Sequence, residues 1–364
     1  MEEFNSLEEV AEKITNKLDS FSAKKSVIAL YAFNATGKTR LANMLGADKE
    51  DEVESDSIKV LCYDTFFEDM FGWNNEDYIL NFNPKSWIIQ LINEQGLEKS
   101  VVNNFKDIVN SNIEPIFDVS KGEVTFNIAS GDDKSEMNIK ISKGEESMFK
   151  WSIFYTLIET AIDALNTKED DRTTSMFNGL QYIIIDDPVS SIDDTKIITM
   201  AIKLIETIKS SKNSILNFCI TTHHALFYNV FVNSFKKDKK CNFESYSLSK
   251  NNQIFVLSKQ GDSPFSYHLS IKELIQTAIK NNDIEKYHFN LFRNLLEKTS
   301  NFLGYNNWVD CIPIGDKQEF IRLLNLYSHS KLSELEGAEL SGNDKNLFQQ
   351  TFSSFIKDFK WNEK

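Results

Sequence analysis

Cysteine is scarce in this 364-residue chain, with four in all, and long apolar runs are missing. The cysteines (Cys62, Cys219, Cys241 and Cys311) form no CxxC pair and have no histidine at metal-site spacing. We therefore expect reduced thiols rather than a disulfide framework or a zinc site. No apolar run approaches the roughly 18 residues that cross a bilayer, and the acidic, amphipathic N-terminus is unlike a secretory signal. We expect a cytoplasmic protein with no membrane partner.

Positive charge is outweighed by negative charge, with 40 Lys and Arg residues against 54 Asp and Glu residues. The formal net charge is −14 at pH 7, which argues against a broad electropositive surface for DNA but leaves room for a local basic site. Hydrophobic residues make up 41% of the chain and charged residues 26%, a composition typical of globular proteins. At this length the chain can form two or three domains.

Apolar patterns before about residue 262 alternate between strands and helices. Strands are indicated at 26–33, 58–67, 123–130, 182–186 and 215–224, and the alternation at 123–130 is typical of an antiparallel strand. One helix is indicated directly after the first strand, and two more are indicated at 145–165 and 194–210. This order predicts an α/β fold with a substantially parallel sheet.

The C-terminal part of the chain has a different pattern, because strand signals fade after about residue 264. Helical periodicity recurs at 270–282, 284–304 and 316–332. We therefore predict an α/β domain at 1–262 and a helical domain at 263–364, with the boundary between about 240 and 265.

A phosphate-binding loop is indicated by AFNATGKT at 32–39, which follows a strand and opens a helix. Backbone amides and the helix N-terminus would cradle phosphate, Lys38 would reach the β- and γ-phosphates, and the Thr39 hydroxyl would bind Mg²⁺. Gly37 completes the GKT end of the pattern, and we expect Asn34 and Arg40 to line the same site. The expected ligand is ATP or GTP with Mg²⁺.

Two positions in this loop depart from the usual glycines. They hold Ala32 and Ala35. Because alanine disfavours positive φ, we expect the loop to form without that conformation at either position. The preference among nucleotides stays open.

The apolar strand at 182–186 runs into paired carboxylates in the segment QYIIIDDPVSSIDD. Charge at the end of a buried strand is costly unless a cation compensates it, and a magnesium ion carrying a nucleotide is the first candidate. Asp186 would hold Mg²⁺, directly or through water. Asp187 would act as the general base that orients the attacking water.

Four motifs occur in an order that resembles the ATP-binding cassette (ABC) ATPases: GKT, ISKGE at 141–145, IIIDDPVSSID, and a histidine after the strand that ends in TTHH. In such proteins two cassettes pack head to tail, so the resemblance implies a dimer of this chain. Ser142 and Gly144 would contact the γ-phosphate held by a partner chain, and the helix beginning at Glu145 would aim its positive end at the same charge.

The cassette resemblance also implies roles for the residues around the acidic pair. Ser190, Ser191 and Asp193 would form the loop between protomers, and His223 would sense the γ-phosphate. Asp187 stands where many such ATPases carry glutamate, and its shorter side chain predicts slow hydrolysis. Only about 100 residues separate the GKT and ISKGE motifs, without sustained heptads, unlike the long coiled-coil insertions of Rad50- or SMC-like proteins.

Three residues of the helical region form a second candidate site. Arg293 and Glu297 lie four residues apart on one expected helix face, and His329 is near the end of another helix. Taken alone, such an Arg–Glu pair is most often a solvent-exposed ion pair. Brought together, the three would suit metal-independent RNA cleavage. One group would remove the 2′-OH proton, another would protonate the leaving 5′ oxygen, and the guanidinium would offset charge on the phosphorane.

Segments from both regions resemble the PrrC-type anticodon nucleases. The similarity runs from about residue 26 to the C-terminus. It is carried by YAFNATGKTRL, KGEESMFKWSIFYTL, IIDDPVSSIDD, TTHHALFYNV, GDSPFSYHL, EKYHFNLFRNLLEKTSNFLGY and SHSKLS. The fold that it implies is an ABC-type P-loop ATPase domain followed by an all-α nuclease domain.

The resemblance implies a latent tRNA-cutting toxin used against phage. Such nucleases cleave tRNA(Lys) beside the wobble base with an Arg-Glu-His triad, leaving a 2′,3′-cyclic phosphate and a 5′-hydroxyl. Arg293, Glu297 and His329 match that triad, and Asp262 matches an aspartate associated with recognising the modified wobble base. The resemblance also implies restraint by a type I restriction-modification complex, release by nucleotide hydrolysis and a phage antirestriction signal, and dTTP as a second regulatory nucleotide.

Two other interpretations stay open on sequence alone. In the first, the chain is a regulatory ATPase whose helical tail docks a separate effector or a DNA restriction complex. In the second, it is a cassette ATPase that senses DNA ends. Intact tRNA after incubation with the protein would favour the first, and ATP-dependent DNA binding the second.

Overall fold

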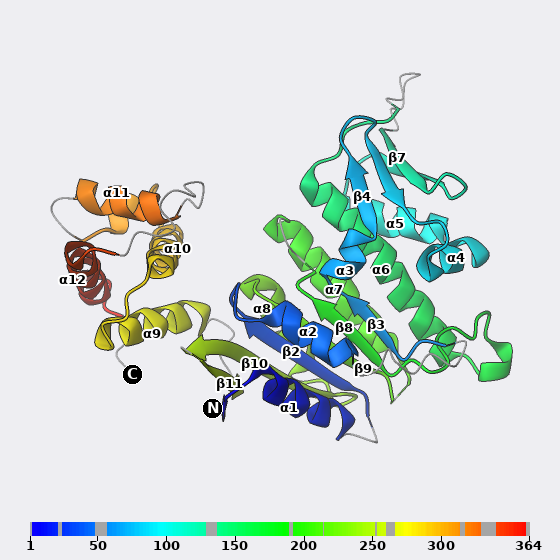
Figure 1. Ribbon diagram of the computed structural model, residues 1–364, viewed down its shortest axis with the longest axis horizontal. Coiled ribbons are helices and arrows are strands. Elements are labelled where there is room, and N and C mark those ends of the chain that lie inside the picture. Colours follow the sequence, from blue (N-terminus) through cyan, green and yellow to red (C-terminus); the bar gives the residue numbers. More distant parts are fainter. Residues whose placement is uncertain are drawn as a thin grey trace. The chain divides into compact units, whose positions relative to one another are not determined.

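The computed structural model folds into two compact units, Met1–Pro264 and Phe265–Lys364, and each is described by itself (Figure 1). The structure describes residues 2–20, 24–47, 57–128, 137–188, 192–213, 215–251, 253–259, 266–313, 317–328 and 340–361. Among the described helices, none combines the length and apolarity that a membrane span requires.

A seven-stranded sheet forms the centre of the first unit. Its strands lie in the order β1 (Glu2–Phe4), β11 (Ile254–Lys259), β10 (Asn242–Asn251), β2 (Ser26–Ala32), β9 (Asn217–Thr222), β8 (Tyr182–Asp186) and β3 (Val60–Tyr63). The five strands from β10 to β3 are parallel, and β11 and β1 add antiparallel strands at one edge. The predicted α/β fold with a largely parallel sheet is confirmed. Because the strands are parallel, β2, β8 and β9 all end at the same edge of the sheet.

Helices cover both faces of this sheet, which explains why β2 is buried along its whole length. α1 (Leu7–Asp19) and α2 (Lys38–Ala47) share one core cluster with alternate residues of β2, such as Ile28 and Leu30. α7 (Asp194–Ser210) packs beside α8 (Ala225–Phe235), and α8 contacts β2 and β9. The predicted helix at 194–210 is confirmed.

A smaller antiparallel sheet occupies the stretch between the GKT and ISKGE motifs. Its strands lie in the order β4 (Phe71–Asn74), β5 (Ile79–Phe82), β7 (Glu123–Ile128) and β6 (Ile113–Asp118). α4 (Trp87–Glu94) and α5 (Glu98–Val109) connect β5 to β6. The sheet and α5 pack on the long helix α6 (Lys143–Asn166) through phenylalanines, with the ring of Phe149 5.1 Å from that of Phe126 and 5.5 Å from that of Phe105. The antiparallel strand predicted at 123–130 is confirmed over Glu123–Ile128, and residues 129–130 lie outside the described residues.

Two element boundaries differ from the predictions because a side chain caps a helix there. The strand expected at 58–67 ends at Tyr63, since the Asp64 carboxylate accepts a hydrogen bond from the backbone N–H of Phe67 at 2.9 Å and starts α3 (Thr65–Asp69). α6 begins at Lys143 rather than at 145, with Ser142 as its N-cap. A short 3₁₀ helix, η1 (Glu169–Asp171), follows α6.

The described residues of the second unit form helices: α9 (Ser266–Lys280), α10 (Lys286–Leu303), the 3₁₀ helix η2 (Trp308–Cys311), α11 (Lys317–Ser328) and α12 (Gly342–Asp358). The three helical segments predicted here correspond to α9, α10 and α11, whereas α12 was not predicted. Phenylalanines build the core, and the ring of Phe292 on α10 lies 5.6 Å from that of Phe320 on α11 and 5.1 Å from that of Phe352 on α12. This core fixes α10 against α11.

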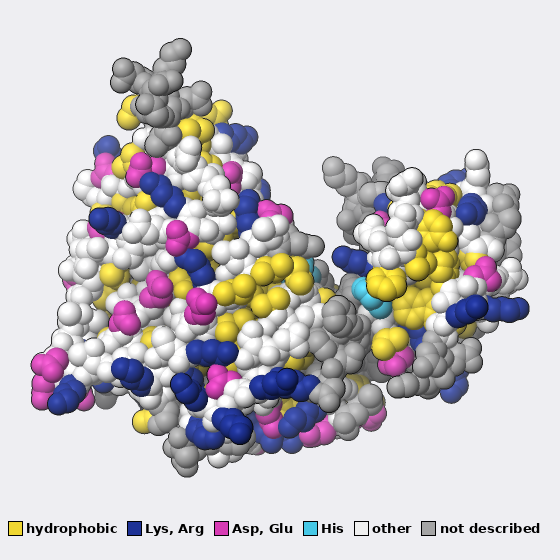
Figure 2. All heavy atoms as spheres, turned by 180° about the vertical axis from the view of Figure 1, so that it is seen from behind, with side chains coloured by type: hydrophobic (Ala, Val, Ile, Leu, Met, Phe, Trp, Pro, Cys, Tyr) yellow, Lys and Arg dark blue, Asp and Glu magenta, His cyan; other side chains and the backbone are white. Residues whose placement is uncertain are grey.

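Charged side chains of both signs reach the surface. On the face seen in Figure 2, Lys and Arg side chains are interspersed with Asp and Glu rather than merged into one basic surface. Apolar side chains also reach the surface of the first unit, among them Ile198 and Ile202 on α7, which are 37% and 44% exposed.

Candidate functional site

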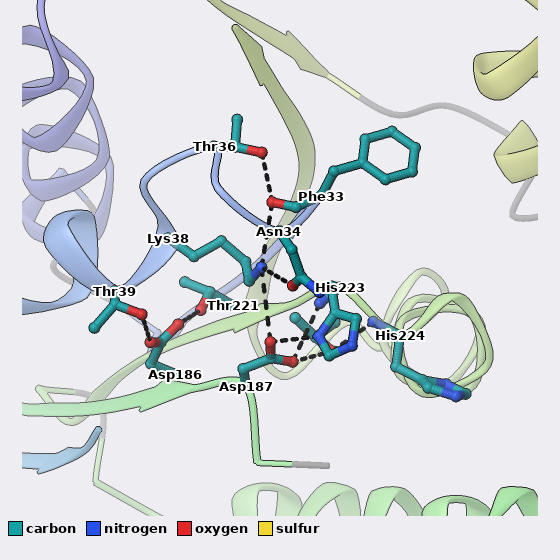
Figure 3. A network of polar contacts seen from close by, with 11 residues as sticks. Phe33, Asn34, Thr36, Lys38, Thr39, Asp186, Asp187, Thr221, His223 and His224 are labelled. Carbon is teal, nitrogen blue, oxygen red and sulfur yellow. Dashed lines mark hydrogen bonds and ion pairs between the residues drawn. The ribbon is translucent and has the colours of Figure 1, made fainter. Parts of the chain in front are cut away.

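Polar side chains from three elements meet where β2, β8 and β9 end (Figure 3). The loop after β2 turns into α2, and Lys38, the first residue of α2, is buried there. Its Nζ donates to the backbone oxygen of Phe33 at 3.3 Å and to Asn34 Oδ1 at 3.2 Å, and it lies 3.6 Å from Asp187 Oδ2. The lysine ammonium is therefore held among three acceptors where the loop after β2 meets the start of α2.

The two alanines of the phosphate-binding loop have different backbones. Ala32 ends β2 in an extended, fully buried conformation that needs no glycine. Ala35 has a φ of 63°, and Gly37 has a φ of 101°. The expectation that the loop forms without positive φ is therefore wrong for Ala35, which adopts the left-handed conformation despite its Cβ. The turn of the loop is imposed by its anchors in β2 and α2 rather than by local preference.

Asp186 is buried at the end of β8 and accepts two hydroxyl hydrogen bonds. Thr39 Oγ1 donates to Asp186 Oδ2 at 2.6 Å, and Thr221 Oγ1 donates to Asp186 Oδ1. The parallel register, in which Asp186 pairs with Thr221, creates the second contact. Burial raises the pKa of the Asp186 carboxyl, and the two hydroxyl hydrogen bonds offset only part of that effect.

Asp187 turns toward the other side of the same site. Its φ is 51°, a left-handed conformation that aspartate tolerates better than most residues. Its carboxylate contacts His223 Nδ1, accepts from the backbone N–H of His223 at 3.2 Å and accepts from Thr222 Oγ1 at 3.2 Å. Burial pushes the pKa of Asp187 up, but the hydrogen bonds and charge of His223, with Lys38 nearby, outweigh burial and hold that pKa below its ordinary value. Asp187 is therefore ionised at neutral pH.

The donor set around Thr39 fits magnesium. Mg²⁺ takes oxygen ligands and is held in nucleotide sites by one or two protein groups together with phosphates and water. The Thr39 hydroxyl and the Asp186 carboxylate provide two oxygens 2.6 Å apart at the start of α2. In the described part of the chain no cluster of three or more His, Cys, Asp or Glu side chains forms a metal site of its own.

The residues of the ISKGE motif form a helix cap. Ser142 Oγ accepts from the backbone N–H of Glu145 at 3.2 Å, and the Glu145 carboxylate accepts from the backbone N–H of Ser142 at 2.7 Å. Gly144 lies in the first turn of α6. This capping box leaves Ser142 exposed at a helix N-terminus, where its hydroxyl hydrogen can point outward.

Two other predicted site residues, Asp193 and Arg40, form their contacts away from Lys38. Asp193 is the N-cap of α7, accepts from the backbone N–H of Lys196 at 3.1 Å and forms an ion pair with the Lys196 side chain. Arg40 is exposed and lies 3.9 Å from Glu8 on α1. Four further predicted site residues lie outside the described residues: Ser190, Ser191, Asp262 and His329.

In the helical unit, Arg293 and Glu297 are joined as predicted from their spacing. Arg293 Nε donates to Glu297 Oε1 at 2.9 Å. The structure adds two partners: Arg293 Nη1 donates to Asn325 Oδ1 of α11 at 3.1 Å, and the guanidinium carbon lies 5.1 Å from the centre of the Trp308 ring. The Arg293 side chain is 22% exposed, so this is a half-buried, multiply held guanidinium rather than a loose surface pair.

Sequence reasoning missed four residues of these two sites. Thr221 and Thr222 lie within the TTHH motif, and the strand pairing between β8 and β9 would have placed them beside the acidic pair. Asn325 and Trp308 have no local signal, because only the packing of α11 and η2 on α10 brings them to Arg293.

We predict that Ala35→Gly raises the free energy of unfolding by about 0.5–1 kcal/mol, because glycine adopts positive φ without the Cβ penalty. Ala32→Gly is the matched control. At that buried, extended position glycine should lower the free energy of unfolding by a similar amount. Urea unfolding without nucleotide measures both variants. A less stable Ala35→Gly protein would contradict the assignment of strain to this residue.

We predict that Asp186→Asn stabilises the nucleotide-free protein at neutral pH. Because the folded-state pKa of Asp186 is raised, the ionised carboxylate costs stability at neutral pH, and the neutral amide avoids that cost. The contribution of such a carboxyl is most favourable at low pH and is lost as the pH rises through its raised pKa. The gain from asparagine should therefore shrink as the pH is lowered.

Urea unfolding at neutral and mildly acidic pH tests this sign. Loss of stability in Asp186→Asn at neutral pH would show that the carboxylate is not destabilising. A thermal shift with ATP and Mg²⁺ is the companion measurement, in which the wild type should gain more stability than the variant.

Comparisons with known proteins match both units. The family model AAA_13, described as an AAA domain, matches residues 88–357. An Escherichia coli protein described as "Anticodon nuclease" is 38% identical over 362 residues, and the alignment covers 93% of this chain and 90% of that protein.

Solved structures with a similar fold are more distant. The SMC head domain from Thermotoga maritima has a TM-score of 0.31 and 13% identity, and covers 66% of this chain and 92% of its own. An SMC head bound to the C-terminal winged-helix domain of ScpA has a TM-score of 0.36 and 8% identity, over 66% of this chain and 91% of that one. RNase-L Inhibitor has a TM-score of 0.35 and 12% identity, over 70% of this chain and 38% of that one. At these scores no function transfers from the solved structures.

Sequence identity across nearly the whole length, together with a P-loop ATPase-type α/β unit and a helical unit, settles the relationship. The chain belongs to the anticodon nuclease family.

Proposed function

We propose that this protein is a nucleotide-regulated endoribonuclease that cleaves a tRNA in its anticodon loop. The observation that carries the proposal is the 38% identity to an anticodon nuclease over 93% of the chain, a span that includes the Arg293–Glu297 pair. In this proposal residues 1–262 bind and hydrolyse the nucleotide, and residues 263–364 cleave RNA in the cytoplasm.

The nucleotide half of the proposal rests on the polar site at the ends of β2, β8 and β9. Thr39 and Asp186 would hold Mg²⁺, which supplies charge neutralisation for the β- and γ-phosphates of ATP or GTP. Lys38 would exchange its contact with Asp187 for phosphate oxygens. Asp187, ionised and held by His223, would orient the attacking water. Asn34 and Gly37 lie in the same loop, and Arg40 follows it on α2.

The dimer half of the proposal rests on the exposed N-terminus of α6. A second copy, packed head to tail, would receive Ser142, Gly144 and Glu145 against its γ-phosphate. Ser190, Ser191 and Asp193 would lie between the protomers. Closure of such a dimer would couple nucleotide state to the helical units.

The proposed cleavage transfers the phosphate to the neighbouring 2′ oxygen. The base, Glu297 or His329, removes the 2′-OH proton as that oxygen attacks phosphorus. The bond from phosphorus to the 5′ oxygen breaks, and the other group protonates the leaving oxygen. The products are a 2′,3′-cyclic phosphate and a 5′-hydroxyl, without a metal ion. Arg293 would offset the charge on the phosphorane.

The finer assignments come from the family resemblance. We propose tRNA(Lys) as the substrate, with Asp262 recognising the modified wobble base. An unpaired anticodon loop suits recognition by stacking and base-edge contacts, which an acidic protein can provide without a broad basic surface. We further propose that the protein is an antiphage toxin silenced by a type I restriction-modification complex. Nucleotide hydrolysis and a phage antirestriction signal would release it, with dTTP as a second regulatory nucleotide.

A regulatory ATPase whose helical unit only docks a separate effector is the alternative. The geometry at Arg293 favours the nuclease, because a guanidinium held by Glu297, Asn325 and Trp308 is organised as in a site for a phosphate group. A docking surface has no need of this arrangement.

We predict that purified protein cuts bulk tRNA in an anticodon loop, with ends that mapping identifies as cyclic phosphate and 5′-hydroxyl. Arg293→Ala, Glu297→Ala and His329→Ala should each slow cleavage by at least about a hundredfold, since each removes a group that acts in the transition state. ATP hydrolysis should be unchanged, because the variants lie in the other unit. Lys38→Ala should abolish nucleotide binding.

Cleavage in the presence of ATP, GTP and dTTP completes the test. Intact anticodon loops under all three nucleotides would favour the docking alternative. Wild-type cleavage by His329→Ala would remove that residue from the triad.

A further inference from the structure

The guanidinium of Arg293 is held on three sides by groups from three elements. Glu297, one turn further along α10, accepts from Nε at 2.9 Å. Asn325 of α11 accepts from Nη1 at 3.1 Å. Trp308 of η2 lies against the guanidinium, with 5.1 Å between the guanidinium carbon and the ring centre. Among the described residues no hydrogen bond or ion pair from Nη2 is found, so this nitrogen can donate to a ligand.

The contacts with Trp308 and Asn325 go beyond an ion pair within one helix. An i,i+4 pair needs only Glu297, and an exposed pair of this kind leaves a long side chain free to change rotamer. Here the ring of Trp308 restricts the guanidinium plane through a cation–π contact. Asn325 then restricts rotation of the guanidinium within that plane, because its side-chain oxygen accepts a hydrogen bond from only one of the two terminal nitrogens.

We propose that Asn325 and Trp308 are positioning residues for Arg293, and that with Glu297 they form a slot that holds its guanidinium with Nη2 toward the scissile phosphate. The inference rests on the proposed nuclease function. Neither residue touches RNA in this account. They restrict Arg293 to one rotamer before the substrate binds. Less side-chain entropy is then lost on binding.

Asn325 has a second consequence because it lies on α11. It is four positions before His329, and α11 is described as far as Ser328. The bond from Arg293 to Asn325 therefore ties the position of the guanidinium to the end of the helix that leads into His329. One interhelix hydrogen bond thus links α10, which carries Arg293 and Glu297, to α11.

A purely structural role for these residues is the competing explanation, and chemical rescue separates the two. A slot built for a guanidinium should bind free guanidinium ion once the arginine side chain is removed. We would measure single-turnover tRNA cleavage by Arg293→Ala protein while adding guanidinium chloride, at concentrations well below those that unfold proteins. Sodium chloride at the same ionic strength and urea, an uncharged molecule of similar shape, are the controls.

We expect guanidinium to restore Arg293→Ala cleavage at least about tenfold, and urea not to. Adding Trp308→Leu or Asn325→Leu to Arg293→Ala should raise the half-maximal guanidinium concentration about tenfold, because a cation–π contact or a hydrogen bond is lost. Trp308→Phe and Asn325→Asp, which keep a ring and an acceptor, should shift it by less than about threefold. In the protein that retains Arg293, Trp308→Leu and Asn325→Leu should each slow cleavage roughly tenfold with ATP hydrolysis unchanged.

Matched controls come from exposed residues of α10. Phe302→Leu replaces another aromatic residue and Asn301→Leu another asparagine, both at exposed positions, and neither should alter rescue or cleavage. Melting temperatures identify variants that fail to fold.

The outcomes separate the inference from the proposed function. Wild-type cleavage by Arg293→Ala would refute the role of Arg293 itself and with it the proposed catalytic site. Loss of cleavage in Arg293→Ala without guanidinium rescue, or rescue that Trp308→Leu and Asn325→Leu leave unaltered, would overturn only the positioning role.

Discussion

Two adjacent carboxylates at the end of a buried strand are the constraint on which the nucleotide site depends. Asp186 and Asp187 cannot share one environment without strong repulsion, and the fold separates them through the left-handed backbone at Asp187. Asp186 is compensated by hydroxyls from Thr39 and Thr221, and Asp187 by His223 and Lys38. The two carboxyls consequently have pKa values shifted in opposite directions. Asp186 is suited to bind a metal ion, and the ionised carboxylate of Asp187 is suited to accept a hydrogen bond from water.

In the helical unit, too, the position of a charged group depends on the surrounding fold. Here the packing of helices, rather than the ends of strands, positions the guanidinium of Arg293. The phenylalanine core fixes α10 against α11 and α12, and that rigidity lets Arg293 meet Asn325 across a helix interface. Each unit therefore organises a polar site at the border of an apolar core. In the proposed enzyme, the first site governs when the second is used.

Much of the first site could be predicted from sequence because its residues follow strands in short motifs. The motifs identify Lys38, Thr39, Asp186, Asp187 and His223, since parallel strands bring their carboxyl ends to one edge of the sheet. The positive φ of Ala35 could not be predicted from the sequence, because alanine disfavours that conformation. Only the anchoring of the loop in β2 and α2 imposes it. The end of β3 at Tyr63 could not be predicted either, because the apolar pattern continues past it. The side chain of Asp64 caps a helix within that apolar run.

Sequence by itself determined the α/β and helical halves, the motif order and the Arg293–Glu297 pair, because each depends on spacing along one strand or one helix. Only the tertiary structure decided that Thr221 and Thr222 support the acidic pair, and that Asn325 and Trp308 hold Arg293. The physical reason is that strand register and helix packing bring together residues distant in the chain. No local pattern records those contacts.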